Sequence, residues 1–260
     1  TKYSGVTPID YTYYYYGAGN ARAGVTVNTA MALSQTQSTA AAPVTAGVAN
    51  AFTKSITTYL GTIGQEQSDM TTKYAGVTPI DYTHYYYGAA QDRAGSAAAI
   101  NAPMTMSQTQ KTAARPVALT ITADTKSITY YKGNAPGDEQ SDYTVKYANS
   151  AIVDYTAYYY DVSGTATRAN AATTLNAKMT LSHTTRTGVA ASSAAEANTK
   201  SITSYAGLLG DEQSDITTKY SGVTPIDYTY YYYGAGDGKT VVTGNTAIAL
   251  SETESPPAAP

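Results

Sequence analysis

The chain has 260 residues, 13% of them charged, and a formal net charge of −3. Soluble domains usually carry about 25% charged residues. Lys and Arg are scattered singly here, so there is no basic stripe to neutralise a phosphate backbone, and we expect no nucleic-acid partner. No run of about 18 apolar residues appears, which predicts no membrane span. Without cysteine, the chain forms no disulfide.

Tyrosine is the dominant aromatic residue, with 27 Tyr against one Phe and no Trp. Thr, Ala and Ser fill much of the remainder. Because β-branched and aromatic residues favour a pleated, half-buried surface, this composition predicts an all-β fold. Low charge with abundant Thr and Ser suits exposed fibrous material, so we expect an extracellular or cell-surface location. No Asn begins an Asn-x-Ser/Thr sequon, which leaves O-linked sugar as the glycosylation to expect.

A tyrosine-rich stretch recurs four times, beginning at Val6, Val77, Ala151 and Val223. The matched lysines that precede it are 71, 73 and 73 residues apart, which gives a period of about 73: Lys2, Lys73, Lys146 and Lys219. A long fixed period is typical of repeat architectures. We predict tandem repeats of about four antiparallel strands each, as a β-sandwich or an elongated β array. The expected boundaries are an incomplete first repeat at 1–43, then 44–115, 116–188, and 189–260 with a Pro-rich tail.

The first predicted strand of each repeat is the tyrosine-rich stretch, residues 7–16 in the first copy. Alternation places Tyr11 and Tyr15 on one face and Asp10 and Tyr14 on the other. Both faces carry aromatic rings, so the strand needs cover on both sides, from its own subunit or from a neighbour. The third position after the Asp varies widely in volume, which a packed core rarely accepts, so we expect it to be peripheral. Its residues are Tyr13, His84, Ala157 and Tyr230.

The second predicted strand follows a Gly-rich loop and covers residues 31–36, where large apolar residues two apart mark a buried face. The third, residues 53–59, also has apolar residues at helical spacing. The corresponding stretch of the next copy, after residues 125–131, holds Gly133, Pro136 and Gly137, which favours a hairpin over a helix. We therefore predict a hairpin from the third strand to the fourth, residues 67–74.

The count of strands bears on function. The chain starts with one strand of the first type and one of the second type. After them, the order third, fourth, first and second type occurs three times. One pair therefore lacks a hairpin and exposes hydrogen-bonding edges. Addition of a strand from a neighbouring subunit would cover such an edge, and a contact of this kind that does not close gives a helical filament. The leading hypothesis is a structural subunit of an extracellular filament or surface layer, a homo-polymer in contact through tyrosine-rich strands.

The alternative hypothesis is a repeated carbohydrate-binding adhesin or lectin. An Asp flanked by Tyr suits sugar, because the carboxylate accepts hydrogen bonds from hydroxyls and the rings stack on sugar faces. A structural hydrogen bond of the Asp is the simpler explanation. The candidate residues for assembly or sugar contact are Asp10, Tyr11, Tyr14, Tyr16, Asp81, Tyr82, Tyr85, Tyr87, Asp154, Tyr155, Tyr158, Tyr160, Asp227, Tyr228, Tyr231 and Tyr233.

Acidic clusters lie in the loops between the third and fourth strands. Calcium takes several oxygen ligands, so these residues are weak calcium candidates, although their spacing differs from the EF-hand loop: Asp138, Glu139, Asp142, Asp211, Glu212 and Asp215. His84 and His183 lie in different repeats, which argues against zinc. Four equivalent Asp positions argue against a single catalytic centre, and no Gly-x-Ser-x-Gly elbow is present. We therefore predict that the protein is not an enzyme and that it binds no cofactor.

Overall fold

The computed structural model describes residues 2–4, 7–20, 28–115, 120–169, 176–233 and 248–255. Over these ranges the chain forms strands joined by turns and loops, with no helix. The all-β prediction is therefore confirmed. Accordingly, no helix that could cross a membrane exists in the described ranges.

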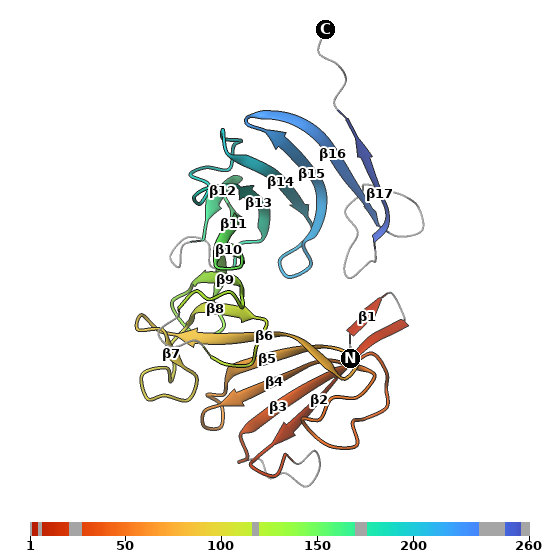
Figure 1. The fold of residues 1–260 in the computed structure, drawn as a ribbon, viewed down its shortest axis with the longest axis vertical. Coiled ribbons are helices and arrows are strands. Elements are labelled where there is room, and N and C mark those ends of the chain that lie inside the picture. The colour runs from red at the N-terminus through yellow and green to blue at the C-terminus, as the bar shows by residue number, and fades with distance from the viewer. Residues whose placement is uncertain are drawn as a thin grey trace. The chain divides into compact units, whose positions relative to one another are not determined.

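The described residues belong to two compact units, the first comprising Thr1–Ile128 with Ala135–Glu139 and Ala148–Ala151. Its strands lie side by side in Figure 1 and pair antiparallel in chain order, except that β6 pairs with both β7 and β8. They are β1 (Lys2–Ser4), β2 (Thr7–Tyr16), β3 (Met31–Gln37), β4 (Thr53–Leu60), β5 (Gln67–Ala75), β6 (Thr78–Tyr87), β7 (Asp92–Arg93) and β8 (Met104–Gln110).

The second unit comprises Thr129–Asn134, Gln140–Tyr147 and Ile152–Pro260. Here β11 pairs with both β12 and β13, and the later strands pair antiparallel in chain order. Two strands run across the division between the units, β9 (Thr125–Lys132) and β10 (Gln140–Ala148). The others are β11 (Ala151–Val162), β12 (Thr165–Arg168), β13 (Met179–Thr185), β14 (Thr199–Ala206), β15 (Gln213–Ser221), β16 (Thr224–Tyr233) and β17 (Ile248–Glu254).

The predicted strands correspond to observed ones, and we name them by their place in the repeat. The a strands are β2, β6, β11 and β16; the b strands are β3, β8, β13 and β17; the c strands are β4, β9 and β14; and the d strands are β5, β10 and β15, with β1 as a short counterpart. The stretch with helical spacing is strand β4. The four a strands meet their b strands in one register, through Tyr11 with Gln37, Tyr82 with Gln110, Tyr155 with Thr185, and Tyr228 with Glu254. The predicted repeat boundaries stay a prediction, and the Pro-rich tail after residue 255 lies outside the described residues.

Loops of the chain itself cover both faces of the a strands. On one face, Tyr15 packs with Leu33 and Ile56, and Ala46 and Ala49 of the b–c connector lie against them. On the other face, Tyr87 packs with Ala94 and Ala99 of the a–b loop. The aromatic rings are thus buried by alanine-rich segments that lie on the sheet, because small side chains allow the loop backbone to approach closely.

The expectation of a peripheral third position after the Asp is wrong. His84 is 1% exposed and Ala157 is fully buried. The spread of volumes is tolerated because the b–c connector, which differs in sequence between repeats, packs against this position. The Tyr13 hydroxyl donates to the carbonyl of Ala40 at 2.5 Å, whereas Ala157 contacts the buried Ala190.

Candidate functional site

The Asp of each a strand lies beside a lysine. In three repeats this lysine belongs to the following c strand, two strands away: Lys54 pairs with Asp10, Lys126 with Asp81, and Lys200 with Asp154 at 2.9 Å. The b–c pairing of the first and third repeats has a register shift at the start of the c strand, and such an irregularity re-aims a side chain. The Asp therefore ties strand a to strand c across strand b.

The fourth Asp lacks this partner. No c strand follows β17 in the described residues, and Asp227 instead lies 3.8 Å from Lys219 of the d strand β15. Its side chain is 32% exposed, compared with 8% for Asp154 and 20% for Asp10. The most accessible of the four carboxylates is thus the one without a c-strand lysine.

Hydroxyl groups link the c, d and a strands in a second recurring pattern. The Thr57 and Thr71 hydroxyls lie 2.7 Å apart, and the Tyr85 hydroxyl donates to Thr71 at 3.0 Å. The same chains recur in the next repeats as Thr129–Thr144–Tyr158 and Thr203–Thr217–Tyr231. The matching residue of the first repeat, Tyr14, is 50% exposed. Tyr14 lies on β2, which pairs with β1 only through Thr7–Asp10.

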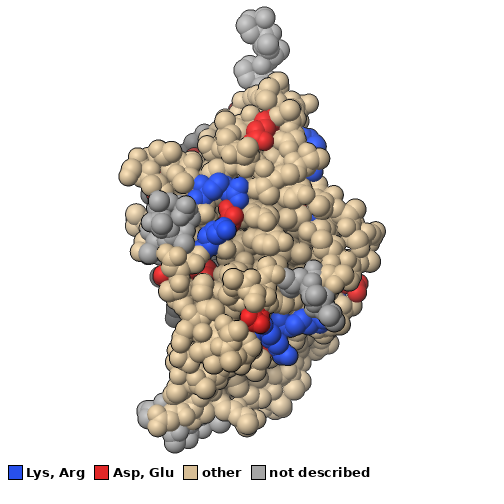
Figure 2. Space-filling view, turned by 90° about the vertical axis from the view of Figure 1, so that its left-hand side faces the viewer, with Lys and Arg blue, Asp and Glu red and all other residues tan. Residues whose placement is uncertain are grey.

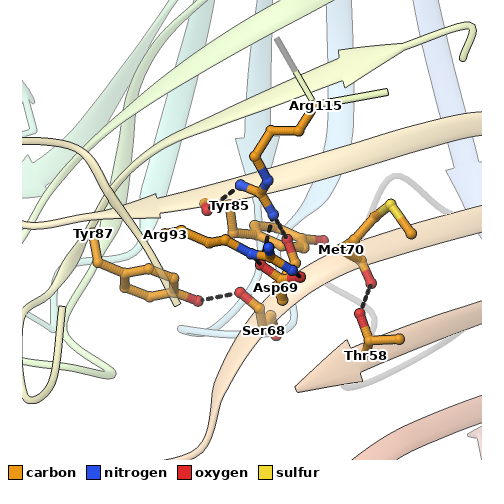
Figure 3. Close-up of polar contacts among 8 residues, drawn as sticks. All are labelled: Thr58, Ser68, Asp69, Met70, Tyr85, Tyr87, Arg93 and Arg115. Atoms are coloured by element: carbon orange, nitrogen blue, oxygen red, sulfur yellow. Dashed lines mark hydrogen bonds and ion pairs between the residues drawn. The ribbon is translucent and has the colours of Figure 1, made fainter. Parts of the chain in front are cut away.

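A second tyrosine of the a strand bonds to the backbone of strand d. The hydroxyls of Tyr87, Tyr160 and Tyr233 donate to the carbonyls of Ser68, Ser141 and Ser214 at 2.7–2.9 Å, and Figure 3 shows the Tyr87 bond. Burial raises the pKa of Tyr87 and of Tyr160. Both remain protonated donors at neutral pH, so these candidate residues act within the fold.

A polar residue of the b strand contacts the first Thr of the c strand. The residues Gln35, Gln108 and His183 are fully buried, and they bond to the hydroxyls of Thr53, Thr125 and Thr199 at 3.1, 3.3 and 2.8 Å. Their counterpart on β17 is Glu252, which is exposed. The b strand therefore buries this position where a c strand covers it.

No family model, curated protein or solved structure matches this chain. The tyrosine that directly follows the Asp is half-buried in all four a strands: Tyr11, Tyr82, Tyr155 and Tyr228.

The acidic loop residues form backbone contacts. The carboxylates of Glu66, Glu139 and Glu212 accept from the N–H at the start of the neighbouring b strand, at Met31, Met104 and Met179, over 2.8–3.2 Å. Glu139 and Glu212 also accept from Gly137 and Gly210 of their own loops. Over the described ranges no three His, Asp or Glu side chains gather as a metal site. These contacts give each Glu a structural role in joining the c–d loop to strand b.

Three arginines that the sequence interpretation missed hold the buried Asp of the d strand. Arg93 binds both carboxylate oxygens of Asp69, and Arg115 binds one of them at 2.6 Å and the Asp69 carbonyl at 2.8 Å (Figure 3). In the next repeat Arg168 pairs with Asp142. The short strands β7 and β12, which fold back on the a strands, place Arg93 and Arg168. Figure 2 shows such basic atoms beside acidic ones on a largely uncharged face.

His84 lies near this cluster, and among the described residues neither of its ring nitrogens has a hydrogen-bond partner. Burial lowers the pKa of His84 to about 4, and the Arg115 guanidinium contributes in the same direction. The imidazole is therefore neutral at physiological pH. The imidazole fills space in the core as a buried, uncharged ring. The matched position in the third repeat is occupied by Ala157.

A cavity of about 270 Å³ lies in the first unit, lined in part by Glu66, Tyr85, Tyr87 and Glu139. This volume is slightly below the roughly 300–1,000 Å³ of most small-molecule pockets. The polar groups named here already bond to Met31, Thr71, Ser68 and Met104. The cavity brings together two candidate tyrosines, yet their hydroxyls serve the strand contacts.

Proposed function

We propose that this protein is the structural subunit of an extracellular filament or surface layer. In this proposal it polymerises with itself, and tandem repeats of about 73 residues build an elongated β array in preference to a sandwich. The Asp–Lys, Thr–Thr–Tyr and Glu–backbone contacts recur at matched positions. When the same contacts recur from one repeat to the next, a further repeat can be added to the array through contacts of the same kind.

The observation that carries the proposal is the state of the two edge strands. Half of a recurring contact is present at each edge: the exposed Tyr14 on β2, and Asp227 with the exposed Glu252 next to β17. Among the described strands, β17 pairs only with β16. An open edge recruits further strands, and a heterologous contact that does not close produces a filament.

Exposed apolar residues at the turns between d and a strands further support contact between molecules. Val77 and Val223 are 63% and 61% exposed, and Ile80 and Ile226 are 45% and 43% exposed. They occupy matched positions in the second and fourth repeats. Burial of these side chains between two molecules would remove their apolar surface from water.

The lectin alternative has less support. Three of the four Asp residues that would accept sugar hydroxyls are paired with lysine of the following c strand. The hydroxyls of Tyr85, Tyr158 and Tyr231 on the a strands bond to a Thr of strand d. In a sugar-binding site the carboxylates and hydroxyls are hydrogen-bonded to water before the sugar arrives, and the sugar then replaces that water. Groups already bonded to the protein cannot do this. Covalent O-linked sugar on exposed Thr or Ser is compatible with the filament proposal.

Negative-stain electron microscopy tests the proposal against its alternative. Concentrated purified protein is imaged, and the same sample is applied to a glycan array together with the Asp81→Ala variant. We expect ordered filaments or sheets, with no glycan binding that depends on Asp81. Separate, non-associating particles that bind a glycan through Asp81 would contradict the filament proposal and establish the lectin.

A further inference from the structure

The strands β2 and β16 have the same sequence but different neighbours. Residues 7–16 and 224–233 are identical, and each strand pairs with a b strand on one side. On the other side β16 pairs with the d strand β15 as far as Tyr230. Among the described strands only β1 pairs with this side of β2, and it reaches no further than Asp10. Within the described residues, the second half of β2 therefore has a neighbouring strand on one side only.

The d strand of the fourth repeat shows which contact β2 lacks. Thr217 of β15 lies opposite Thr229, and its hydroxyl is 3.2 Å from the hydroxyl of Tyr231. The same Thr217 hydroxyl lies 2.8 Å from that of Thr203 on the strand beyond, so one Thr joins three strands. The residue of β2 that matches Tyr231 is Tyr14, which is 50% exposed, whereas Tyr231 is half-buried. A strand that placed a Thr hydroxyl beside Tyr14 would complete the contact.

The strand β17 carries a Thr in the corresponding setting. The hydroxyls of Thr253 and Thr229 lie 3.0 Å apart, much as those of Thr217 and Thr203 do. Residues 251–255 are exposed, and among the described strands β17 pairs only with β16. Thr253 is thus joined to a Thr of one neighbouring strand, as Thr217 is, and no described strand lies on its other side.

We propose that β17 of one molecule pairs antiparallel with the second half of β2 of the next molecule, with Thr253 opposite Thr12. The Tyr14 hydroxyl then bonds to Thr253, as Tyr231 bonds to Thr217. The partner of the β17 edge is β2 of a second copy, and β2 keeps its own pairing with β1 and β3. The inference rests on the proposed function, because it names the contact through which the array is extended.

Backbone geometry agrees with this register. Residues of an antiparallel pair alternate between positions that exchange backbone hydrogen bonds and positions that do not. Thr12 and Thr253 belong to equivalent Thr pairs, one with Thr36 and the other with Thr229. Their backbone groups therefore point either both toward their own partner or both away from it, so the two residues form a regular pair when the strands meet. A shift by one residue would place Thr253 and Tyr14 on opposite faces of the sheet.

The contact joins two different edges, because β17 is a b strand and β2 is an a strand. Each molecule that docks through one edge still presents the other edge to the next molecule. A heterologous contact of this kind, when the rotation does not close, gives an open filament. The added strand gains backbone hydrogen bonds, and the side-chain contacts fix which residues meet.

Mixed cysteine variants of the full chain test the contact and its register. The chain has no cysteine, so Thr253→Cys in one preparation and Thr12→Cys in another, with tags of different mass, should form a disulfide that links the two chains under mild oxidation. Directly opposite residues of an antiparallel pair lie within the Cα separation that a disulfide spans. The matched control is Thr83→Cys, because Thr83 occupies the Thr12 position on β6 and Thr71 of β5 already lies opposite it. We expect at least tenfold less mixed product from the control.

A chain that carries both Thr12→Cys and Thr253→Cys distinguishes contact between molecules from closure within one. We expect linked products of two or more chains, in amounts that rise with protein concentration. A disulfide formed only within single chains would overturn the proposal that a second molecule is the partner.

The hydroxyl contact has its own test. Tyr14→Phe removes one hydrogen bond and should weaken association about two- to tenfold in sedimentation velocity. Tyr231→Phe alters the same residue in the identical strand β16, where Thr217 already serves as partner, and should leave association unchanged. Equal effects of the two substitutions would contradict the contact of Tyr14 with Thr253.

The cross-linking result can be separated from the proposed function by electron microscopy of the same samples. A yield with Thr12→Cys no higher than with Thr83→Cys would overturn the contact between β17 and β2. If ordered filaments still form in that case, the proposed function stands and another surface carries it. If the disulfide forms without filaments, the contact stands and the filament proposal fails; if neither appears, both fail.

Discussion

Asp69 and Asp81 both form ion pairs, but burial makes the pairs of Asp69 contribute more to the free energy of unfolding than the pair of Asp81. Asp69 is nearly buried and held by two guanidinium groups, whereas Asp81 is more exposed and pairs with one flexible lysine. Removing one partner of a buried ion pair leaves uncompensated charge in a medium of low dielectric constant. A partly exposed pair is screened by water and salt, so its loss costs little.

Asp69→Ala leaves Arg93, 58% exposed, and Arg115, 21% exposed, without their carboxylate, so we expect it to lower the free energy of unfolding by about 1.5–3 kcal/mol. We expect Asp81→Ala to lower it by less than about 1 kcal/mol. Urea denaturation followed by circular dichroism measures both. Equal losses for the two variants would show that Asp69 and its arginines do not behave as a buried cluster.

His84 gives a second residue-scale prediction, concerning pH. Its pKa is about 4 in the folded chain and about 6.5 when unfolded. The unfolded state therefore binds a proton more readily, and stability present above pH 6.5 is lost as pH falls through 4. The loss reaches about 3 kcal/mol for a difference of this size.

The matched variant is His84→Ala, because Ala157 occupies the same position in the third repeat. We expect the variant to lose most of the change in stability between pH 7 and pH 4, whatever its stability at pH 7. Denaturant midpoints at several pH values measure this difference. An unchanged pH dependence in the variant would show that the imidazole of His84 is not the group that loses stability as the pH falls.

At the scale of elements, the c–d loop is joined to strand b by a glutamate. Glu139 accepts from the backbone of Met104 and of Gly137, each at 2.8 Å. Hydrogen bonds to a charged group contribute about 1.5–3 kcal/mol each at most, and partial exposure reduces this. We expect Glu139→Ala to cost about 1–2 kcal/mol, and Asp138→Ala less than about 0.5 kcal/mol. Similar costs for both would show that the Glu139 contacts contribute little.

Alternating patterns predicted the strands well, because one buried face imposes a period of two. The b strand around Leu33 and the d strand around Thr72 were recognised in this way. The Gly and Pro residues at 133–137 correctly indicated that the matching stretch around Ile56 is a strand and not a helix. The short strands β7 and β12 were missed, because two to four residues carry no detectable period. Pairing of Arg93 with Asp69 joins residues 24 apart in the sequence, so only the fold brings them together.

The burial of His84 was also misjudged, for a reason that lies outside the a strand. The variation in side-chain volume predicts a peripheral position, whereas in the structure the b–c connector packs against a different residue in each repeat. The ion pair between Lys54 and Asp10 was likewise missed, although both residue types recur in the repeats. Two constant features of the sequence could have indicated this ion pair: the Lys in the Thr-Lys-Ser-Ile-Thr of every c strand and the Asp of every a strand.

At the scale of the whole molecule, the recurring side-chain contacts are complete where a described strand has neighbours on both sides and half-formed at β2 and β17. An array of this kind has no intrinsic limit, since each added strand presents a new edge. The two compact units use the same Thr–Thr–Tyr contacts. The central claim is that the molecule extends this pattern to further copies of itself.

Sedimentation velocity over a wide range of protein concentration tests that claim most directly. We expect species much heavier than the 27.2 kDa chain that grow as the protein concentration rises. A single species at the mass of one chain, at every concentration and salt condition, would contradict it.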